Sequence, residues 1–287
     1  MNYLLGKDSN VYFCICEDKI IVYQDLLSKI ISKKEYDILV GKTMKYIIQI
    51  SENIFVIKSN KVKYKGKDEL IFFNFSAKKI IEPKTNTSYS FSYTTNGLSI
   101  MSNEPKKENV SNIKNQILLC ACKKYIKKQK NGILLVNMEI LQDNLYLSKI
   151  FYNTGDFEVY CFCPLLSFNK NKIIEVNEEI DKKSTEYFLV GGLDLKKGKG
   201  LIKLYKVNYG KEYFQNKIDF IEDIVILHNN NKYLIHGAIS CIIQSSINGD
   251  IIASSWDGNV YLFEINLEYY LNYNKNQLYK GLINDRS

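Results

Sequence analysis

The sequence predicts an all-β fold. Three observations indicate it: the residue types of the apolar runs, the rarity of helical spacing, and a repeated strand–turn–strand unit. The apolar runs are short, rich in Ile, Val, Tyr and Phe, and separated by polar turns. Such side chains suit the pleated, half-buried surface of a strand. A sustained apolar stripe at helical spacing is hard to find, and residues 267–277 are either a short helix or a run toward a last strand. Many short strands with regular turns are typical of a sandwich, a barrel or a propeller.

The expected strands run along the whole chain. They are residues 10–16, 19–26, 44–50, 53–58, 70–75, 88–93, 116–122, 132–139, 147–151, 158–166, 186–193, 200–207, 217–221, 238–244, 250–255 and 259–265. The longest polar stretches lie near 103–115, 123–131 and 169–184. We interpret these three stretches as insertions within one domain that spans residues 1–287, and not as linkers between domains.

A repeat favours the propeller among these architectures. Residues 237–263 read as strand, turn, strand, turn, strand. The turns carry Asn248-Gly249 and Asp257-Gly258, dipeptides that suit the positive φ angles of tight hairpins. Residues 188–205 have the same shape, with Asp194 before a glycine-containing turn. Self-similarity of this kind is a mark of repeat architectures.

The unit at 237–263 resembles a WD40 repeat, most clearly in the segment Ser254-Ser255-Trp256-Asp257-Gly258-Asn259-Val260-Tyr261-Leu262-Phe263. The WD40 family joins a Ser or Thr, a turn Asp, a His and a Trp in a hydrogen-bonded tetrad. The resemblance implies that Ser255 and Asp257 take two of these positions. His236 lies close to the His position, and Phe263 stands where the Trp is expected.

The resemblance is clearest over residues 186–265 and implies a WD40-like β-propeller. Dividing the expected strands into fours gives about five to six recognisable four-stranded blades. The 287 residues suit one propeller but are short for seven blades. Whether the ring is complete stays open at this point, because an open ring would need a partner to cover its exposed repeat faces.

The net charge is +8, from 39 Lys and Arg against 31 Asp and Glu, and Arg286 is the only arginine. Proteins that read nucleic acid rely on the planar fork of arginine, so a lysine surface is weak evidence for such a partner. The most basic segment holds Lys123, Lys124, Lys127, Lys128 and Lys130. This loop is either a solvated hairpin or a site that grips the phosphates of RNA or DNA.

The sequence offers little for catalysis, and we expect a protein that is not an enzyme and takes no cofactor. Its only histidines are His228 and His236, which leaves few options for a histidine base. Gly41-Lys42-Thr43 resembles the end of a phosphate-binding loop, but Tyr36 stands where that pattern requires a glycine.

Six of the seven cysteines form Cys-x-Cys pairs: Cys14/Cys16, Cys120/Cys122 and Cys161/Cys163, with Cys241 alone. Residues two apart in a strand share a face. Two converging pairs would make a soft-metal site. The spacing does not match the usual zinc patterns, so we interpret these cysteines as free thiols on the buried side of strands and expect no metal.

The function we expect is a non-catalytic protein-interaction scaffold in a larger intracellular complex, with RNA or DNA binding through residues 123–130 as the alternative. The N-terminal residues do not resemble a signal peptide, and no apolar stretch approaches about 18 residues, so we expect a cytoplasmic or nuclear protein with no membrane partner. Trp256 is either an exposed anchor for another protein or a side chain packed over the neighbouring turn.

Overall fold

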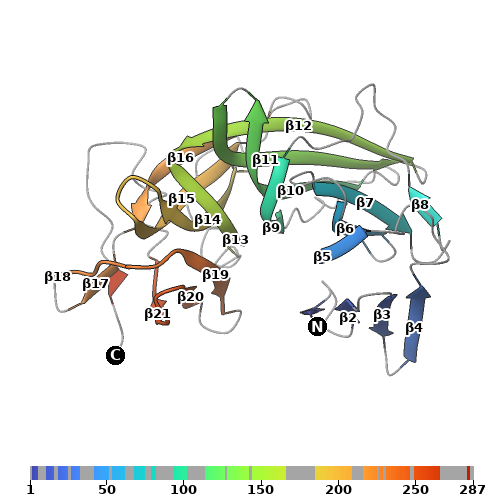
Figure 1. The fold of residues 1–287 in the computed structure, drawn as a ribbon, viewed down its shortest axis with the longest axis horizontal. Helices are drawn as coiled ribbons and strands as arrows, with labels where there is room; N and C mark the ends of the chain where they lie inside the picture. Colours follow the sequence, from blue (N-terminus) through green and yellow to red (C-terminus); the bar gives the residue numbers. More distant parts are fainter. Residues whose placement is uncertain are drawn as a thin grey trace, which may run out of the picture. The chain divides into compact units, whose positions relative to one another are not determined.

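The structure is a computed structural model. It describes residues 2–5, 11–15, 19–24, 27–32, 42–51, 54–61, 68–74, 79–81, 93–101, 114–126, 128–141, 144–165, 185–208, 216–224, 226–228, 231–245, 249–265 and 283–284. All regular elements in these ranges are β-strands, so the all-β prediction is confirmed for them (Figure 1). The insertions expected near 103–115 and 169–184 lie outside the described residues, apart from 114 and 115.

Most strands form four-stranded antiparallel sheets in which each strand pairs with its neighbour in the sequence. The first sheet consists of β1 (Asn2–Leu5), β2 (Val11–Ile15), β3 (Lys19–Gln24) and β4 (Leu27–Ser32). The second consists of β5 (Lys42–Ser51), β6 (Ile54–Lys61), β7 (Asp68–Asn74) and β8 (Lys79–Ile81). These meanders need only short connections between neighbouring strands.

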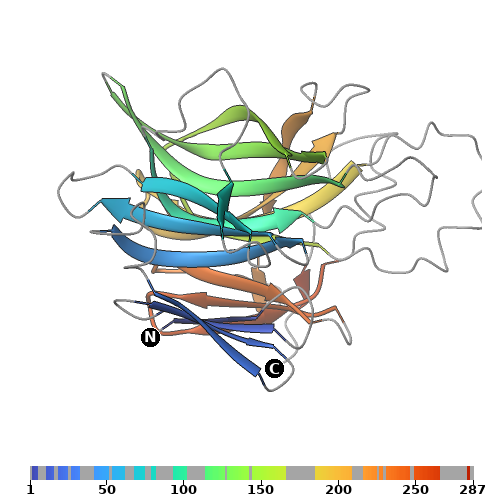
Figure 2. The same cartoon turned by 90° about the vertical axis from the view of Figure 1, so that its right-hand side faces the viewer.

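The third sheet has the longest strands: β9 (Tyr93–Met101), β10 (Lys114–Ile126), β11 (Lys128–Leu141) and β12 (Asn144–Gly155), in the order β12-β11-β10-β9. Its green strands curve visibly along their length (Figure 2). Three expectations differ here. The strand expected at 88–93 lies outside the described residues except for Tyr93, and β9 covers residues for which no strand was expected. The strand expected at 147–151 is the much longer β12, and strand structure continues through most of the expected loop 123–131.

The fourth sheet consists of β13 (Phe157–Pro164), β14 (Thr185–Asp194), β15 (Lys199–Asn208) and β16 (Lys217–Ile224). The fifth has three described strands, β19 (Ile239–Gln244), β20 (Ile251–Ser255) and β21 (Val260–Phe263). A small sheet joins β17 (Ile226–His228) to β18 (Asn231–Lys232) and, in parallel, to β22 (Ile283–Asn284).

Contacts within the chain define two compact units. One comprises Met1–Leu118, Cys122–Gln129 and Val136–Lys149, and the other comprises Leu119–Ala121, Lys130–Leu135 and Ile150–Ser287. The first unit has a core in β6 and β7, where Val56, Ile57, Phe72 and Phe73 are buried. The expectation of one domain over residues 1–287 stays a prediction.

The second unit buries a core between the sheet β13–β16 and the sheet β19–β21. Leu189, Ile202 and Leu204 come from the first of these sheets. Ile239, Ile242, Ala253, Tyr261 and Phe263 come from the second. A fully buried aliphatic or aromatic side chain contributes about 1.5–3 kcal/mol to folding. This packing fixes β20 and β21, and with them the turn that connects them.

Candidate functional site

The turn between β20 and β21 is a tight hairpin turn, as the Asp257-Gly258 dipeptide predicts. The Ser255 N–H donates to the Asn259 carbonyl at 3.1 Å, and the Gly258 N–H donates to the Ser255 carbonyl at 3.1 Å. Gly258 has a φ of 87°. A glycine adopts this left-handed conformation without the steric cost of a Cβ atom.

Asp257 is the centre of a hydrogen-bond network in this turn. Its Oδ1 accepts the Asn259 N–H at 3.0 Å. Its Oδ2 accepts the His236 backbone N–H at 3.2 Å and the Tyr261 hydroxyl at 2.9 Å. The Asp257 N–H in turn donates to Ser255 Oγ at 3.4 Å. The network thus joins the turn to β21 and to the segment that precedes β19.

The network stabilises the charged form of Asp257. Burial by itself acts to raise the pKa of this carboxyl group, but hydrogen bonds from Asn259, Tyr261, Ser255 and His236 oppose that effect and together lower the pKa to about 2. Asp257 therefore carries a negative charge over the whole physiological range.

Of the four residues suggested for a tetrad, two contact each other through a side chain and a third contacts Asp257 only through its backbone. Ser255 and Asp257 lie in the turn, and His236 contributes its backbone N–H. Phe263 is only 1% exposed and lies in the apolar core instead. The aromatic side chain that reaches Asp257 is Tyr261, which the sequence analysis did not single out. Tyr261 lies two residues before Phe263, on the same face of β21, and has the hydroxyl that Phe263 lacks.

Gly237 allows this close approach of the segment before β19. A Cβ atom at this position would lie 2.3 Å from the Asp257 backbone nitrogen and 2.9 Å from Ser255 Oγ. Real Cβ atoms do not approach backbone nitrogen this closely, because van der Waals repulsion is too strong. The glycine after His236 is therefore required by the network.

The Trp256 side chain is largely exposed, as an anchor for another protein would be, and it is also packed, although on a strand and not over the neighbouring turn. Its side chain is 63% exposed, yet its indole packs on Tyr160 of β13, with ring centroids 4.8 Å apart and planes tilted by 59°. Its backbone N–H donates to the Ala238 carbonyl at 2.9 Å. Tyr160 donates its hydroxyl to Glu158 Oε1 at 2.9 Å. Burial, followed by this bond and the Glu158 charge, raises the pKa of Tyr160.

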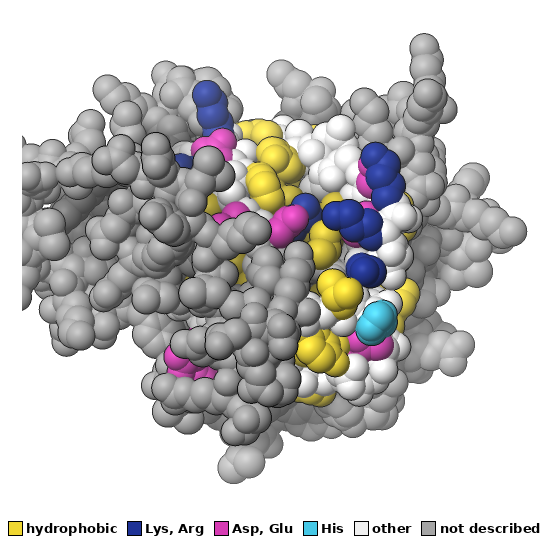
Figure 3. Space-filling model, turned by 90° about the vertical axis from the view of Figure 1, so that its left-hand side faces the viewer, with side chains coloured by type: hydrophobic (Ala, Val, Ile, Leu, Met, Phe, Trp, Pro, Cys, Tyr) yellow, Lys and Arg dark blue, Asp and Glu magenta, His cyan; other side chains and the backbone are white. Residues whose placement is uncertain are grey.

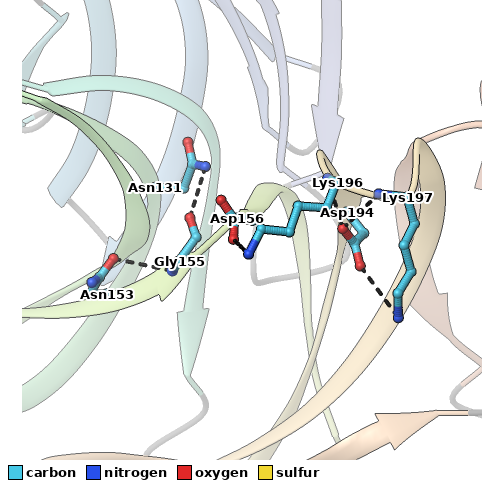
Figure 4. A network of polar contacts seen from close by, with 7 residues as sticks. All are labelled: Asn131, Asn153, Gly155, Asp156, Asp194, Lys196 and Lys197. Carbon is cyan, nitrogen blue, oxygen red and sulfur yellow. Dashed lines mark hydrogen bonds and ion pairs between the residues drawn. The ribbon is translucent and has the colours of Figure 1, made fainter.

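The turn between β14 and β15 repeats the use of an aspartate. Asp194 Oδ1 accepts the N–H groups of Lys196 and Lys197 at 3.0 and 3.1 Å, and Gly198 has a φ of 62°. Lys196 Nζ also lies 2.7 Å from Asp156 Oδ2 (Figure 4). The similarity between residues 188–205 and 237–263 therefore includes an aspartate in each turn. In both turns, its carboxylate accepts backbone N–H groups.

A second polar contact in Figure 4 fixes the turn between β12 and β13. Asn131 Nδ2 donates to the Gly155 carbonyl at 3.1 Å, and the Gly155 N–H donates to Asn153 Oδ1 at 3.1 Å. Gly155 has a φ of 65°. Side-chain amides that satisfy backbone groups in this way are common stabilisers of turns.

The basic segment proposed as a phosphate site lies in the β10–β11 hairpin. Lys123 and Lys124 belong to β10, and Lys128 and Lys130 belong to β11. Lys127 lies outside the described residues. The lysines thus belong mostly to two paired strands, where the expectation placed them in a loop.

The cysteines with described side chains are in the thiol form, and none of them forms a disulfide. Cys120, Cys122 and Cys163 are buried, Cys161 is half-buried, and Cys241 is exposed, unlike the buried position expected for these residues. Burial, and secondarily the charge of Cys241, raises the pKa of Cys163 to about 12. Burial has the same effect on the pKa of Cys161. Both thiols are therefore protonated near neutral pH and are poor nucleophiles.

Among the residues whose positions are described, no group of three or more His, Cys, Asp or Glu side chains is arranged to hold a metal ion. The same part of the chain has no helix long and apolar enough to cross a membrane.

No family model matches the chain, and no curated protein matches it.

Proposed function

We propose that the chain is a WD40-like β-propeller that acts as a non-catalytic scaffold for other proteins in a larger intracellular complex, in the cytoplasm or the nucleus. The observation that carries this proposal is the Asp257 network. It ties a tight turn to the segment before the first strand of the same sheet, and it leaves Trp256 exposed beside the turn.

The sheets support the propeller part of the proposal. Four of them are antiparallel four-stranded meanders, as the blades of a propeller are, and the sheet β19–β21 contains the repeat unit. Small residues stand where two sheets approach closely. A Cβ atom on Gly191 would lie 2.5 Å from Ile239 Cγ2 and 2.6 Å from Cys161 Sγ. Such crowding is what inner blade strands near a common axis would produce.

The surface supports the scaffold part. The face drawn in Figure 3 combines hydrophobic side chains with basic and acidic ones and a histidine. Large apolar side chains that are exposed in the second unit include Trp256 (63%), Val260 (68%) and Ile243 (53%). Exposed apolar groups beside charged ones are typical of surfaces that bind other proteins.

The proposal is tested by purifying the full-length tagged chain from its native cells and then purifying it again through each protein recovered. We expect at least one protein in stoichiometric amount in both directions. If reciprocal purification recovers no stoichiometric protein, the scaffold function is wrong.

A second candidate, binding of RNA or DNA, is favoured by one observation. Four of the five lysines of the basic segment lie on the paired strands β10 and β11. Lysines grouped in one hairpin would contact several phosphates together and release several counterions.

A further inference from the structure

Both the backbone and the indole of Trp256 are held by contacts. The Trp256 backbone N–H donates to the Ala238 carbonyl at 2.9 Å, and the next residue, Asp257, is fixed by the turn network. The indole packs on Tyr160 and is still 63% exposed, so it is positioned before a ligand arrives and remains open to it. Preorganised aromatic side chains of this kind are frequent binding hot spots.

Trp256 and Tyr160 form an aromatic corner. Their ring centroids lie 4.8 Å apart, and the 59° tilt directs the two ring faces differently. The faces of aromatic rings are negative and attract cations. The Tyr160 hydroxyl donates to Glu158 Oε1, and this bond polarises the phenol and makes its ring a better partner for a cation.

One carboxylate contacts the corner. Glu158 accepts the Tyr160 hydroxyl at 2.9 Å and is only 7% exposed. The chain as a whole has a net charge of +8, so a carboxylate beside these aromatic rings is a local departure from its overall charge. Rings and carboxylates together complement an organic cation.

A guanidinium group fits this site better than an ammonium group. It is planar and stacks on an indole, and it is more weakly hydrated, so it loses less when it leaves water. The chain has only one arginine of its own, Arg286. A guanidinium ligand is therefore to be sought on another protein.

We propose that the corner formed by Trp256 and Tyr160, with Glu158 beside it, binds an arginine side chain of a protein partner. This inference rests on the proposed scaffold function and gives one binding site a defined chemistry.

Trp256 is the only tryptophan, so tryptophan fluorescence of the full-length chain, excited at wavelengths where its 22 tyrosines do not absorb, reports on this site alone. The probes are an acetylated and amidated Gly-Arg-Gly peptide and its lysine and citrulline counterparts; citrulline keeps the shape of arginine without its charge. We expect a saturable fluorescence change with the arginine peptide. We expect at least about tenfold weaker binding of the citrulline peptide, because it lacks the cation–π attraction. Equal binding of the citrulline or lysine peptide, or no saturable change with arginine, would overturn the proposal.

The variants use a fluorescently labelled arginine peptide and its anisotropy, because Trp256→Ala removes the intrinsic signal. Trp256→Ala is expected to abolish binding, and Glu158→Gln is expected to weaken it. The matched control is Leu195→Ala, which removes an apolar side chain that is 47% exposed in a different turn. If Trp256→Ala and Leu195→Ala bind the labelled arginine peptide equally well, the proposed binding site at Trp256 is wrong. The wild-type peptide series decides the matter if a variant does not fold.

Two further readouts separate this inference from its alternatives. Self-association of the chain that is lost in both Trp256→Ala and Arg286→Lys would make a second copy the occupant and overturn the partner proposal. If stoichiometric protein partners remain bound to Trp256→Ala, the proposed arginine site is wrong, and the scaffold function still stands. Loss of the scaffold function itself is shown only by the absence of partners for the wild-type chain.

Discussion

At the scale of single residues, the clearest feature is the number of donors that converge on Asp257. Backbone N–H groups of His236 and Asn259 and the hydroxyl of Tyr261 all point to its carboxylate. Hydrogen bonds to a charged group are stronger than bonds between neutral groups. The hydrogen bonds of Asp257 therefore connect the turn to β21 and to the segment before β19. They add to the stability that the turn's own backbone hydrogen bonds provide.

The first prediction concerns pH. Asp257 has a pKa of about 2 in the folded chain, below its ordinary value of 3.8, so folding favours its charged form. The resulting stability is fully present above the ordinary pKa and is lost as the pH falls from about 4 to about 2. We therefore expect Asp257→Asn to lower the free energy of unfolding by about 1 kcal/mol near neutral pH, because solvent screens a carboxylate this close to the surface.

Urea unfolding of both proteins between about pH 6 and about pH 2 checks this prediction. The difference between them should shrink toward the acid end, because protonation removes the same charge from the wild type. A difference that stays constant with pH would show that the charge of Asp257 is not what stabilises the turn.

The second prediction separates Tyr261 from Phe263. Tyr261→Phe removes one hydrogen bond to Asp257 and is expected to cost about 0.5–1.5 kcal/mol near neutral pH and less in acid. Phe263→Leu removes buried apolar volume and is expected to cost about 1 kcal/mol or more at every pH. The same urea series measures both. A pH-dependent loss in Phe263→Leu and a constant loss in Tyr261→Phe would reverse the roles assigned here.

Sequence reasoning led to Ser255 and Asp257 because a turn aspartate between two apolar strands has a recognisable pattern. His236 contacts Asp257 through its backbone N–H, whereas the suggested tetrad uses a histidine side chain. Sequence reasoning did not find Tyr261, because the resemblance directed attention to the aromatic residue at 263. The signal that distinguishes the two residues is chemical. Of the two aromatic side chains on one face of β21, only Tyr261 has a group that donates a hydrogen bond.

At the scale of elements, strand existence was predictable and strand length was not. The β-branched and aromatic runs identify most of the described strands. The β10–β11 hairpin extends into a lysine-rich segment that composition marked as a loop, since pairing between neighbouring strands outweighs the weak preferences of individual residues. Only the fold shows which strands have a partner beside them.

The third prediction concerns the connection before β19. Gly237→Ala places a Cβ atom against the Asp257 backbone nitrogen, so we expect a loss of about 1–3 kcal/mol from overpacking. It should also raise the pKa of Asp257, because the His236 N–H moves away. The matched control is Gly198→Ala, where the φ of 62° is strained but no atom lies within 4 Å of the added Cβ.

The control variant is expected to lose only about 1–2 kcal/mol from backbone strain, with no change at Asp257. Urea unfolding gives the stability of both variants, and carboxyl NMR titration follows Asp257. If both variants leave the pKa of Asp257 unchanged, the segment before β19 does not support the turn.

The fourth prediction tests the basic hairpin. If it binds nucleic acid, changing Lys123, Lys124, Lys127, Lys128 and Lys130 to Glu should weaken binding and reduce its dependence on salt. The matched control changes Lys196, Lys197 and Lys199 in the β14–β15 turn. A salt titration with single-stranded and duplex probes measures both variants. Unchanged affinity and salt slope in the five-lysine variant would remove this candidate function.

At the scale of the whole molecule, the account joins an all-β chain of repeated meanders to a role in binding. The sequence resemblance is clearest in one region, and antiparallel four-stranded sheets also occur outside that region. The positive charges behind the net charge of +8 come almost entirely from lysine side chains. The arginine that we propose for the Trp256–Tyr160 corner comes from a partner protein.

The central claim is that these sheets form the blades of one propeller, and an experimental structure of the full-length chain tests it most directly. We predict that the sheets surround a common axis, with β13 and β19 among the strands closest to it and the Asp257 turn on one rim. A structure in which the sheets stack as a sandwich, or form two bodies without a shared axis, would contradict the claim.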